Sequence, residues 1–138
     1  ASTFGFLINY TKNIFPKIEI KNEIICGSFM IISGIIIILS ALILFRKYQT
    51  TITPLNPSNA TKLITDGIYK FSRNPMYLGL LLVLSGISTI LNPIGGFLLI
   101  PLFILYLNLF QIIPEENAMI NLFKDEFLEY KENVRRWI

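Results

Sequence analysis

Two long stretches of the chain contain no charged residue, and they predict the membrane-spanning helices. Residues 24–45 and 76–113 are free of Asp, Glu, Lys and Arg, whereas the charged residues lie between and around them. At about 1.5 Å per residue, the first stretch is long enough to cross the ~30 Å hydrocarbon layer of a bilayer as one helix. Because it starts only at position 24 and is followed by Arg46 and Lys47 in place of a small-residue cleavage site, we interpret it as a retained span rather than a signal peptide.

The second stretch is too long for one helix and contains a turn signal near its middle. Asn92-Pro93 favours a break there, because the residue before a proline avoids the helical region. We therefore expect two helices, at residues 77–91 and 94–113, that form a tight hairpin. Pro101 lies inside the second of them, where it should bend the helix axis.

The tail after the hairpin has the periodicity of an amphipathic helix. Its apolar residues recur at steps of three or four, and its charged residues fall on the rest of the helical wheel. We expect residues 114–138 to form a helix that lies against the membrane face or caps the bundle. Its apolar positions are Met119, Phe123, Phe127, Tyr130, Val134 and Trp137.

These elements together predict an all-α, integral-membrane helical bundle with about three transmembrane helices. The chain is expected to be a single membrane domain, residues 1–138, with its first span at 24–45, a loop at 46–75, the helical hairpin at 76–113 and the C-terminal helix at 114–138. The loop and the tail are rich in Lys and Arg and the hairpin turn has none, so both are expected on the cytoplasmic side. The apolar patch at residues 4–8 is interpreted as an interfacial segment or the remnant of a further helix.

Composition excludes several classes of chemistry. The chain has no His and a single Cys, Cys26, which excludes an internal disulfide, the usual zinc, haem and iron–sulfur ligand sets, and catalytic Ser-His or Cys-His pairs. The formal net charge of +3 does not indicate nucleic acid, because the basic residues flank apolar spans instead of forming a stripe. We expect no metal and no nucleic-acid partner, whereas an oligomer is compatible with so few spans.

The start of the second stretch has the residues of a helix N-terminus that can bind an anion. Asn74 can cap the helix through its side-chain oxygen, and Pro75 fits the first turn because its missing N–H costs nothing there. The N–H groups of residues 76–78 then point outward unpaired, with the positive charge of Arg73 beside them. The alternative is a capped membrane helix with a snorkelling Arg73 and an interfacial Tyr77.

Two adjacent carboxylates, Glu115 and Glu116, follow Pro114 at the end of the hairpin. Near the negative end of a helix dipole and at a membrane boundary they are unfavourable, so a cationic group is expected to compensate them. Because the hairpin returns the chain to the level of residue 75, we expect the pair to lie beside Arg73. The alternative is that the pair opens the tail helix, where acidic residues are favoured.

The predicted pocket combines an anion site, an anionic wall, an apolar floor and aromatic surfaces from Tyr69, Tyr77 and Tyr130. This set suits a zwitterionic ligand with a carboxylate, an ammonium, a cationic centre and a flat ring, and S-adenosylmethionine has those parts. Methyl transfer is a direct displacement in which orientation and desolvation supply most of the rate, so it requires no metal. Gly79 and Gly86 share one helical face, which we interpret as a helix-packing surface.

Three separated motifs stand in a fixed order along the chain: GIYKFSRNPMYLG at residues 67–79, PEE at 114–116, and FLEY with VRRW between 127 and 137. Their order resembles that of the integral-membrane methyltransferases, a superfamily that includes isoprenylcysteine carboxyl methyltransferases and phospholipid N-methyltransferases. The resemblance implies an S-adenosylmethionine site and a lipophilic substrate that enters from the bilayer. Many members have His where this chain has Asn74, so a role that needs a ring nitrogen does not carry over, whereas capping and hydrogen bonding do.

By this resemblance, and from the residues themselves, the catalytic residues are expected to be Glu116 and Arg73. The residues expected to bind or shape the site of the cofactor, S-adenosylmethionine, are Tyr69, Arg73, Asn74, Pro75, Met76, Tyr77, Leu78, Gly79, Glu115, Glu116 and Tyr130.

The sequence thus predicts a methyltransferase that acts on a lipophilic or membrane-embedded acceptor, either an isoprenylcysteine-like carboxylate or a phospholipid-like amine. For an amine, Glu116 would stabilise or remove its proton; for a carboxylate, Arg73 or Arg136 would orient it. One alternative is a membrane-bound, NADPH-dependent reductase of the sterol type, which has a similar Pro-x-Tyr-x-Gly helix start but needs more basic or polar residues than this loop offers. The other is a non-catalytic membrane subunit.

Overall fold

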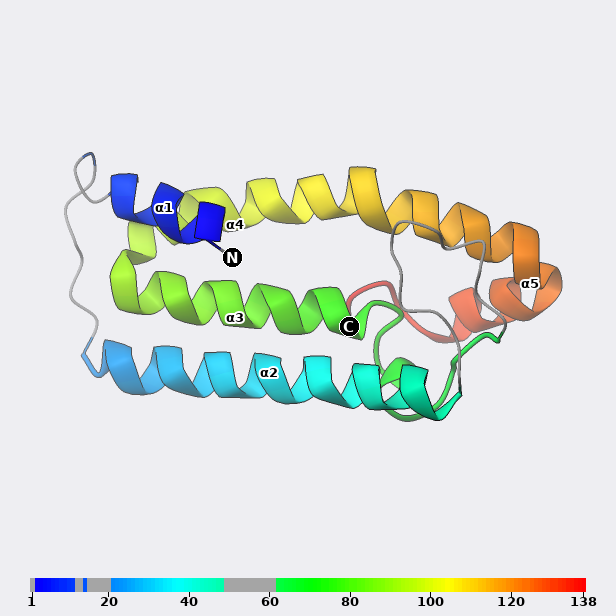
Figure 1. The fold of residues 1–138 in the computed structure, drawn as a ribbon. Helices are drawn as coiled ribbons and strands as arrows, with labels where there is room; N and C mark the ends of the chain where they lie inside the picture. The colour runs from blue at the N-terminus through cyan, green and yellow to red at the C-terminus, as the bar shows by residue number, and fades with distance from the viewer. Residues whose placement is uncertain (1, 12–13, 15–20, 49–61) are drawn as a thin grey trace. The chain divides into compact units, whose positions relative to one another are not determined.

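The structure, a computed structural model, describes residues 2–11, 14, 21–48 and 62–138 (Figure 1). In these ranges the regular elements are all helical, which confirms the predicted fold class. They are α1 (Ser2–Thr11), α2 (Glu23–Lys47), the short 3-10 helix η2 (Gly67–Lys70), α3 (Pro75–Leu91), α4 (Pro93–Leu107), the π-helical turn η3 (Asn108–Ile112) and α5 (Ile113–Asn133). The part of the predicted loop at residues 49–61 lies outside the described residues.

The apolar helices correspond to the predicted spans. Helix α2 is long and apolar enough to cross a membrane, and so is the continuous helix that runs from Pro93 to Asn133, whereas α3 is apolar but shorter. The break between α3 and α4 falls at Asn92, where the sequence predicts the turn of the hairpin.

The chain divides into two compact units, which we describe separately. Unit 1 comprises residues 1–36 and 79–105, and unit 2 comprises residues 37–78 and 106–138. The helices α2, α3 and α4 each contribute to both units.

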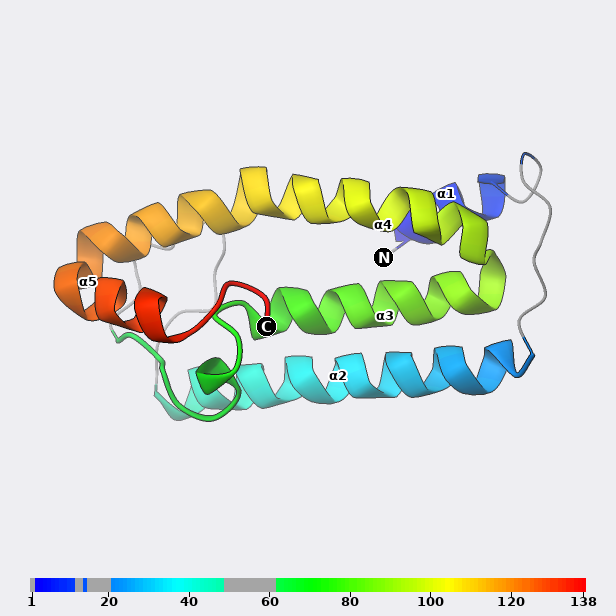
Figure 2. The ribbon, with the colours of Figure 1, turned by 180° about the vertical axis from the view of Figure 1, so that it is seen from behind.

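In unit 1, glycines allow α2 and α3 to pack in close contact, side by side (Figures 1 and 2). A Cβ atom on Gly34 would lie 2.5 Å from the carbonyl oxygen of Gly79, and one on Gly86 would lie 2.5 Å from that of Gly27. A backbone carbonyl cannot move aside as a flexible side chain can, so these positions require glycine. Gly79, expected to help shape the cofactor site, therefore packs against α2 in unit 1.

The turn between α3 and α4 is held by the buried side chain of Asn92. Its Oδ1 accepts a hydrogen bond of 3.3 Å from the N–H of Gly95, which caps the start of α4. Pro93 occupies the first position of α4, where no N–H is needed. Beyond the turn the two helices pack around Leu84, which is 2% exposed. The Asn-Pro dipeptide thus ends one helix and starts the next.

The predicted separate tail helix is instead continuous with the second arm of the hairpin. Residues 93–133 form one helix in which the π-helical turn η3 immediately precedes Pro114. A proline ring crowds the carbonyl four residues earlier, here that of Phe110, and a wider turn relieves this crowding without ending the helix. Glu115 and Glu116 consequently lie inside a continuous helix and not at a free N-terminus, where the helix dipole would stabilise them.

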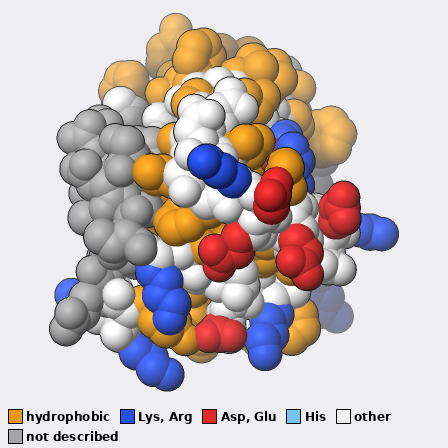
Figure 3. All heavy atoms as spheres, turned by 90° about the vertical axis from the view of Figure 1, so that its right-hand side faces the viewer, with side chains coloured by type: hydrophobic (Ala, Val, Ile, Leu, Met, Phe, Trp, Pro, Cys, Tyr) orange, Lys and Arg blue, Asp and Glu red, His pale blue; other side chains and the backbone are white. Residues whose placement is uncertain are grey.

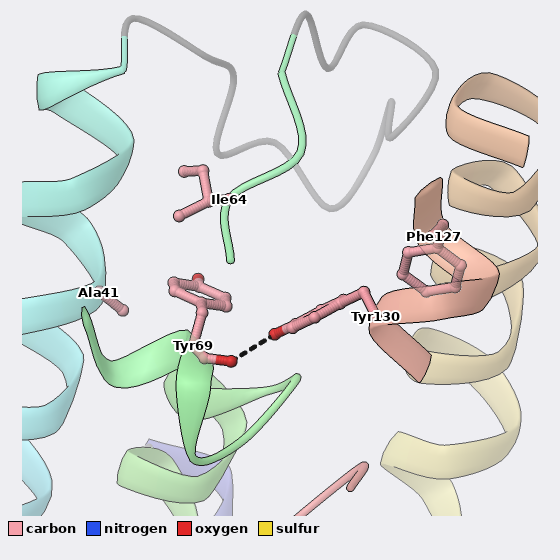
Figure 4. Packing of buried hydrophobic residues seen from close by; sticks show 5 residues of the cluster. All are labelled: Ala41, Ile64, Tyr69, Phe127 and Tyr130. Carbon is pink, nitrogen blue, oxygen red and sulfur yellow. Dashed lines mark hydrogen bonds between the residues drawn. The ribbon is translucent and has the colours of Figure 1, made fainter. Parts of the chain in front are cut away.

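The apolar face of the tail packs into the core of unit 2, as its periodicity predicts. Phe127 and Tyr130 are buried with Ala41, Ile64 and Tyr69 (Figure 4). Partly buried side chains pack around them, namely Leu44, Phe45, Tyr48, Leu63, Ile68, Met76, Met119, Ile120, Phe123 and Val134.

The tail turns back toward this core at a kink in α5. Lys124 has φ 45° and ψ −119°, a positive-φ conformation inside an otherwise helical run. The outer face of the helix beyond it carries the exposed residues Asp125, Glu126, Glu129 and Glu132. Figure 3 shows a face on which acidic and basic side chains gather, with hydrophobic side chains along its upper edge.

We predict that Gly34→Leu destabilises unit 1, because the added side chain meets the backbone of α3. The loss should be about 1–3 kcal/mol in the free energy of unfolding, seen as a lower midpoint of thermal unfolding in detergent. Gly5→Leu is the matched control, since nothing lies within 4 Å of a Cβ at Gly5. Equal midpoints for the two variants would show that the close packing of α2 and α3 is wrong.

We predict that Lys124→Gly stabilises unit 2 by roughly 1 kcal/mol, because glycine adopts a positive φ without the strain that lysine suffers. The same substitution at Lys131, in the regular part of α5, should lower stability by about 1 kcal/mol, since glycine is a poor helix former. Thermal unfolding of the two variants therefore gives shifts of opposite sign. A loss of stability in both would rule out the kink at Lys124.

Candidate functional site

The start of α3 is held by the turn that precedes it. The hydroxyl oxygen of Ser72, a buried residue, accepts a hydrogen bond of 3.1 Å from the N–H of Asn74. Pro75 then begins the helix, and the N–H of Leu78 donates to the carbonyl of Asn74 in the first helical bond, at 3.0 Å. Residues 72–74 are thus fixed directly before the helix that the sequence predicts.

The last residues of the chain dock on this turn. Residues 134–138, which we call the C-terminal strap, leave the helical conformation at Val134. The carbonyl of Arg135 accepts a bond of 3.1 Å from the N–H of Arg73. The Asn74 amide donates to the carbonyl of Arg136 at 3.0 Å, and the Ser72 hydroxyl donates to it at 3.4 Å. The Asn74 side-chain amide therefore donates to the strap, a contact that was not predicted from the sequence.

At the centre of this part of unit 2 is the carboxylate of Glu116, which is 7% exposed. Its Oε1 lies 3.3 Å from Nη2 of Arg73. Arg136 binds it with two parallel hydrogen bonds, from Nε to Oε1 at 3.1 Å and from Nη2 to Oε2 at 2.8 Å. We call Arg73, Glu116 and Arg136 the arginine–glutamate cluster. The expected proximity of Arg73 and Glu116 is thus found, and two guanidinium groups supply the compensating charge.

The Arg73 side chain is buried more deeply than that of Arg136. Its exposed fraction is 8%, and its Nε and Nη1 are buried without a hydrogen-bond partner among the described residues. Burial lowers the pKa of Arg73 and the Glu116 carboxylate opposes that shift, so the group stays protonated. Buried N–H groups normally find an acceptor, so Nε and Nη1 of Arg73 are a candidate site for an anionic group.

The second carboxylate of the pair contacts α3. The Tyr77 hydroxyl donates a hydrogen bond of 2.5 Å to Oε1 of Glu115. Glu116 accepts hydrogen bonds from guanidinium groups at both of its oxygens. Glu115 instead accepts a hydrogen bond from the Tyr77 phenol. The two neighbouring glutamates therefore differ in environment, and Glu115 keeps more capacity to bind a cation.

The other two tyrosines of the predicted site belong to the core of unit 2. Tyr130 donates a hydrogen bond of 2.6 Å from its hydroxyl to the carbonyl of Tyr69, and both residues are buried (Figure 4). Tyr69 also packs edge-on against Phe45, with ring centroids 5.9 Å apart. Tyr69 and Tyr130 thus support the turn before α3, whereas Tyr77 contacts a carboxylate of the site.

Most of the residues predicted for the site lie together in unit 2. Met76 packs against the hydrophobic core, Leu78 is half-buried in α3, and Gly79 lies in unit 1. Two contacts of the site were not predicted from the sequence: that of Ser72 with the strap, and the hydrogen bonds from Arg136 to Glu116. No local signal indicated the latter contact, because Arg136 lies within the tail that the periodicity predicts to be helical. Among the described residues, no three His, Cys, Asp or Glu side chains gather as metal ligands.

Comparisons with known proteins identify the family of this chain. The family model for phospholipid methyltransferases matches residues 22–126. The chain is 32% identical to the Protein-S-isoprenylcysteine O-methyltransferase A of Arabidopsis thaliana over 111 residues, which cover 78% of this chain and 55% of that protein. It is 43% identical to an uncharacterized protein of Haemophilus influenzae over 63 residues, or 46% of this chain and all of that protein.

The chain thus spans about half the length of the Arabidopsis protein. No solved structure matches the chain. The matched region of the family model includes the apolar helices, the turn before α3 and the glutamate pair. The chain belongs to the phospholipid methyltransferase family.

Proposed function

We propose that the chain uses S-adenosylmethionine to methylate a lipophilic acceptor, and that the arginine–glutamate cluster is part of its cofactor site. The observation that carries this proposal is the Arg73 guanidinium, buried and charged, with Nε and Nη1 unpartnered among the described residues. The cofactor has a carboxylate, a charged acceptor that can take a hydrogen bond from Nε or from Nη1 of Arg73.

The glutamates are suited to different tasks at this site. Both oxygens of Glu116 are held by arginines, so we assign it the role of positioning Arg73 and Arg136 rather than of accepting a proton. Glu115, held by the Tyr77 hydroxyl, is the carboxylate available to the ammonium or another cationic part of the ligand. The sequence-based assignment of Glu116 as the proton acceptor for an amine is therefore less favoured than Glu115.

When bound, S-adenosylmethionine supplies a methyl group on a sulfonium, and the acceptor's lone pair displaces the sulfur in one step. The chain's own contribution is to bind, orient and desolvate the reacting groups, which suits a site without His. The acceptor is proposed to be lipophilic because Arg73 directly precedes the apolar helix α3 and Glu116 follows the charge-free stretch of residues 76–113, so that a lipid can arrive from the bilayer.

The proposed orientation places the cluster on the cytoplasmic side. Basic residues are concentrated in the loop before α3 and in the tail, and the turn at Asn92 has none. The name of the Arabidopsis relative and that of the family refer to two different acceptors, a prenylated cysteine and a phospholipid. Both carry a lipid chain, which supports a lipophilic acceptor and leaves the chemical group that is methylated to experiment.

We predict that Arg73→Gln weakens binding of S-adenosylhomocysteine, the product form of the cofactor, by roughly 10- to 100-fold. Hydrogen bonds to a charged group contribute about 1.5–3 kcal/mol, and each 1.4 kcal/mol is tenfold in affinity. Calorimetric titration of the purified protein measures this loss. Arg135→Gln is the matched control, because its exposed side chain is removed while its carbonyl keeps the bond to Arg73.

The unmodified protein, Arg73→Gln and Arg135→Gln are also incubated with membranes and a methyl-labelled cofactor. The unmodified protein and Arg135→Gln should transfer label to a lipid-extractable product, and Arg73→Gln should not. Unchanged binding in Arg73→Gln would remove the basis of the proposed site. Absence of a labelled lipophilic product from the unmodified protein, under conditions where the cofactor binds, would overturn the class of acceptor.

We predict opposite patterns for the two glutamates. Glu115→Gln should retain the fold but lose most of the methyl transfer, because it removes a charge that faces the ligand. Glu116→Gln should lower stability by about 3–5 kcal/mol, since it leaves two guanidinium groups without their carboxylate. Thermal unfolding and label transfer, measured on both variants, separate the roles. A stable but inactive Glu116→Gln would contradict the positioning role.

A further inference from the structure

A second group of charged residues lies where α2 ends. Tyr48 directly follows α2, and its hydroxyl donates a hydrogen bond to Oδ2 of Asp66. The Nζ atom of Lys62 lies 4.1 Å from the centroid of the Tyr48 ring, and that of Lys47 lies 5.7 Å from it. Both ammonium groups are within the range in which a cation is attracted to an aromatic ring. Tyr48 thus organises residues from two separated segments of unit 2.

Positive charge is in excess around this tyrosine. Lys47, Lys62 and Lys70, which we call the lysine cluster, are exposed, and all three act electrostatically on the Asp66 carboxylate. The hydrogen bond from Tyr48 and the fields of these lysines lower the pKa of Asp66, which therefore stays charged at neutral pH. One carboxylate cannot neutralise three ammonium groups, so an anion is favoured at this surface.

The position of the lysine cluster points to the source of the anion. It lies at the end of an apolar span, and Ile43, one turn earlier in α2, is 63% exposed, as expected for a side chain that faces lipid. Phe71, next to Lys70, is 73% exposed. An exposed aromatic residue beside lysines at the end of a span is typical of the membrane–water interface, the level at which lipid phosphates lie.

We propose that the lysine cluster and Tyr48 bind the phosphate headgroup of an anionic phospholipid at the membrane surface. The lysines supply the charge, the tyrosine holds two of them in place, and Phe71 anchors the segment among the acyl chains. Asp66 competes with the lipid for the same ammonium groups. The site shares no residue with the arginine–glutamate cluster, so it does not depend on the proposed methyl transfer.

The test uses the purified full chain in a neutral detergent, with added phosphatidylglycerol or phosphatidylcholine of the same acyl chains. Phosphatidylglycerol should raise the midpoint of thermal unfolding by several degrees and phosphatidylcholine should not. Lys62→Gln/Lys70→Gln should weaken phosphatidylglycerol binding, titrated in the same assay, by about 25-fold, because each basic residue contributes roughly a factor of five near an anionic headgroup.

Two further variants sharpen the result. Lys21→Gln/Lys131→Gln removes the same charge elsewhere and should bind phosphatidylglycerol as the unmodified chain does. Asp66→Asn should bind it more tightly, because it removes the competing charge and can still accept from Tyr48. Equal effects of the two lipids, or equal losses in the two double variants, would overturn the proposal. Inorganic phosphate that reproduces the full shift would show a phosphate site and not a lipid site.

Discussion

The structure of unit 2 depends on one buried carboxylate. Glu116 lies inside a continuous helix, where the dipole gives it no support, and two guanidinium groups hold it, one before α3 and one in the C-terminal strap. A buried charge without partners would cost several kcal/mol, so burial of Glu116 requires that these three segments meet. The ion pairs thus specify the path of the chain at this end of the molecule.

Two other features of the chain bring these three segments together around Glu116. The π-helical turn lets α4 continue past Pro114, which places Glu116 on a rigid helix instead of a loop. The kink at Lys124 then returns the chain, so that Phe127 and Tyr130 are buried and the strap reaches residues 72–74. Backbone strain at the kink is offset by this apolar burial, since each large side chain contributes about 1.5–3 kcal/mol when removed from water.

The chemistry proposed for the site follows from the same geometry. Methyl transfer requires that two reactants be held in line and kept from water, and it makes no demand for a proton carrier such as His. An arginine held by Glu116, with Nε and Nη1 unpartnered among the described residues, is suited to bind a carboxylate. The lysine cluster shares no residue with the arginine–glutamate cluster and has a different proposed role. The arginine–glutamate cluster is proposed to bind the cofactor, and the lysine cluster is proposed to bind a surrounding lipid.

Local sequence was sufficient for the helices of this protein. The charge-free stretches predicted the spans, Asn92-Pro93 predicted the hairpin turn, and the spacing of Phe127 and Tyr130 predicted the buried face of the tail, because these features act over a few residues of backbone. The hairpin also predicted that Arg73 and Glu116 lie close together, because its second helix returns the chain to the membrane face where its first helix begins. Long-range contacts determined the rest. Three features were not predicted from the sequence: Asn74 donates to the strap, the tail continues α4, and Arg136 binds both oxygens of Glu116. They depend on contacts between segments far apart in the sequence, which local periodicity does not predict.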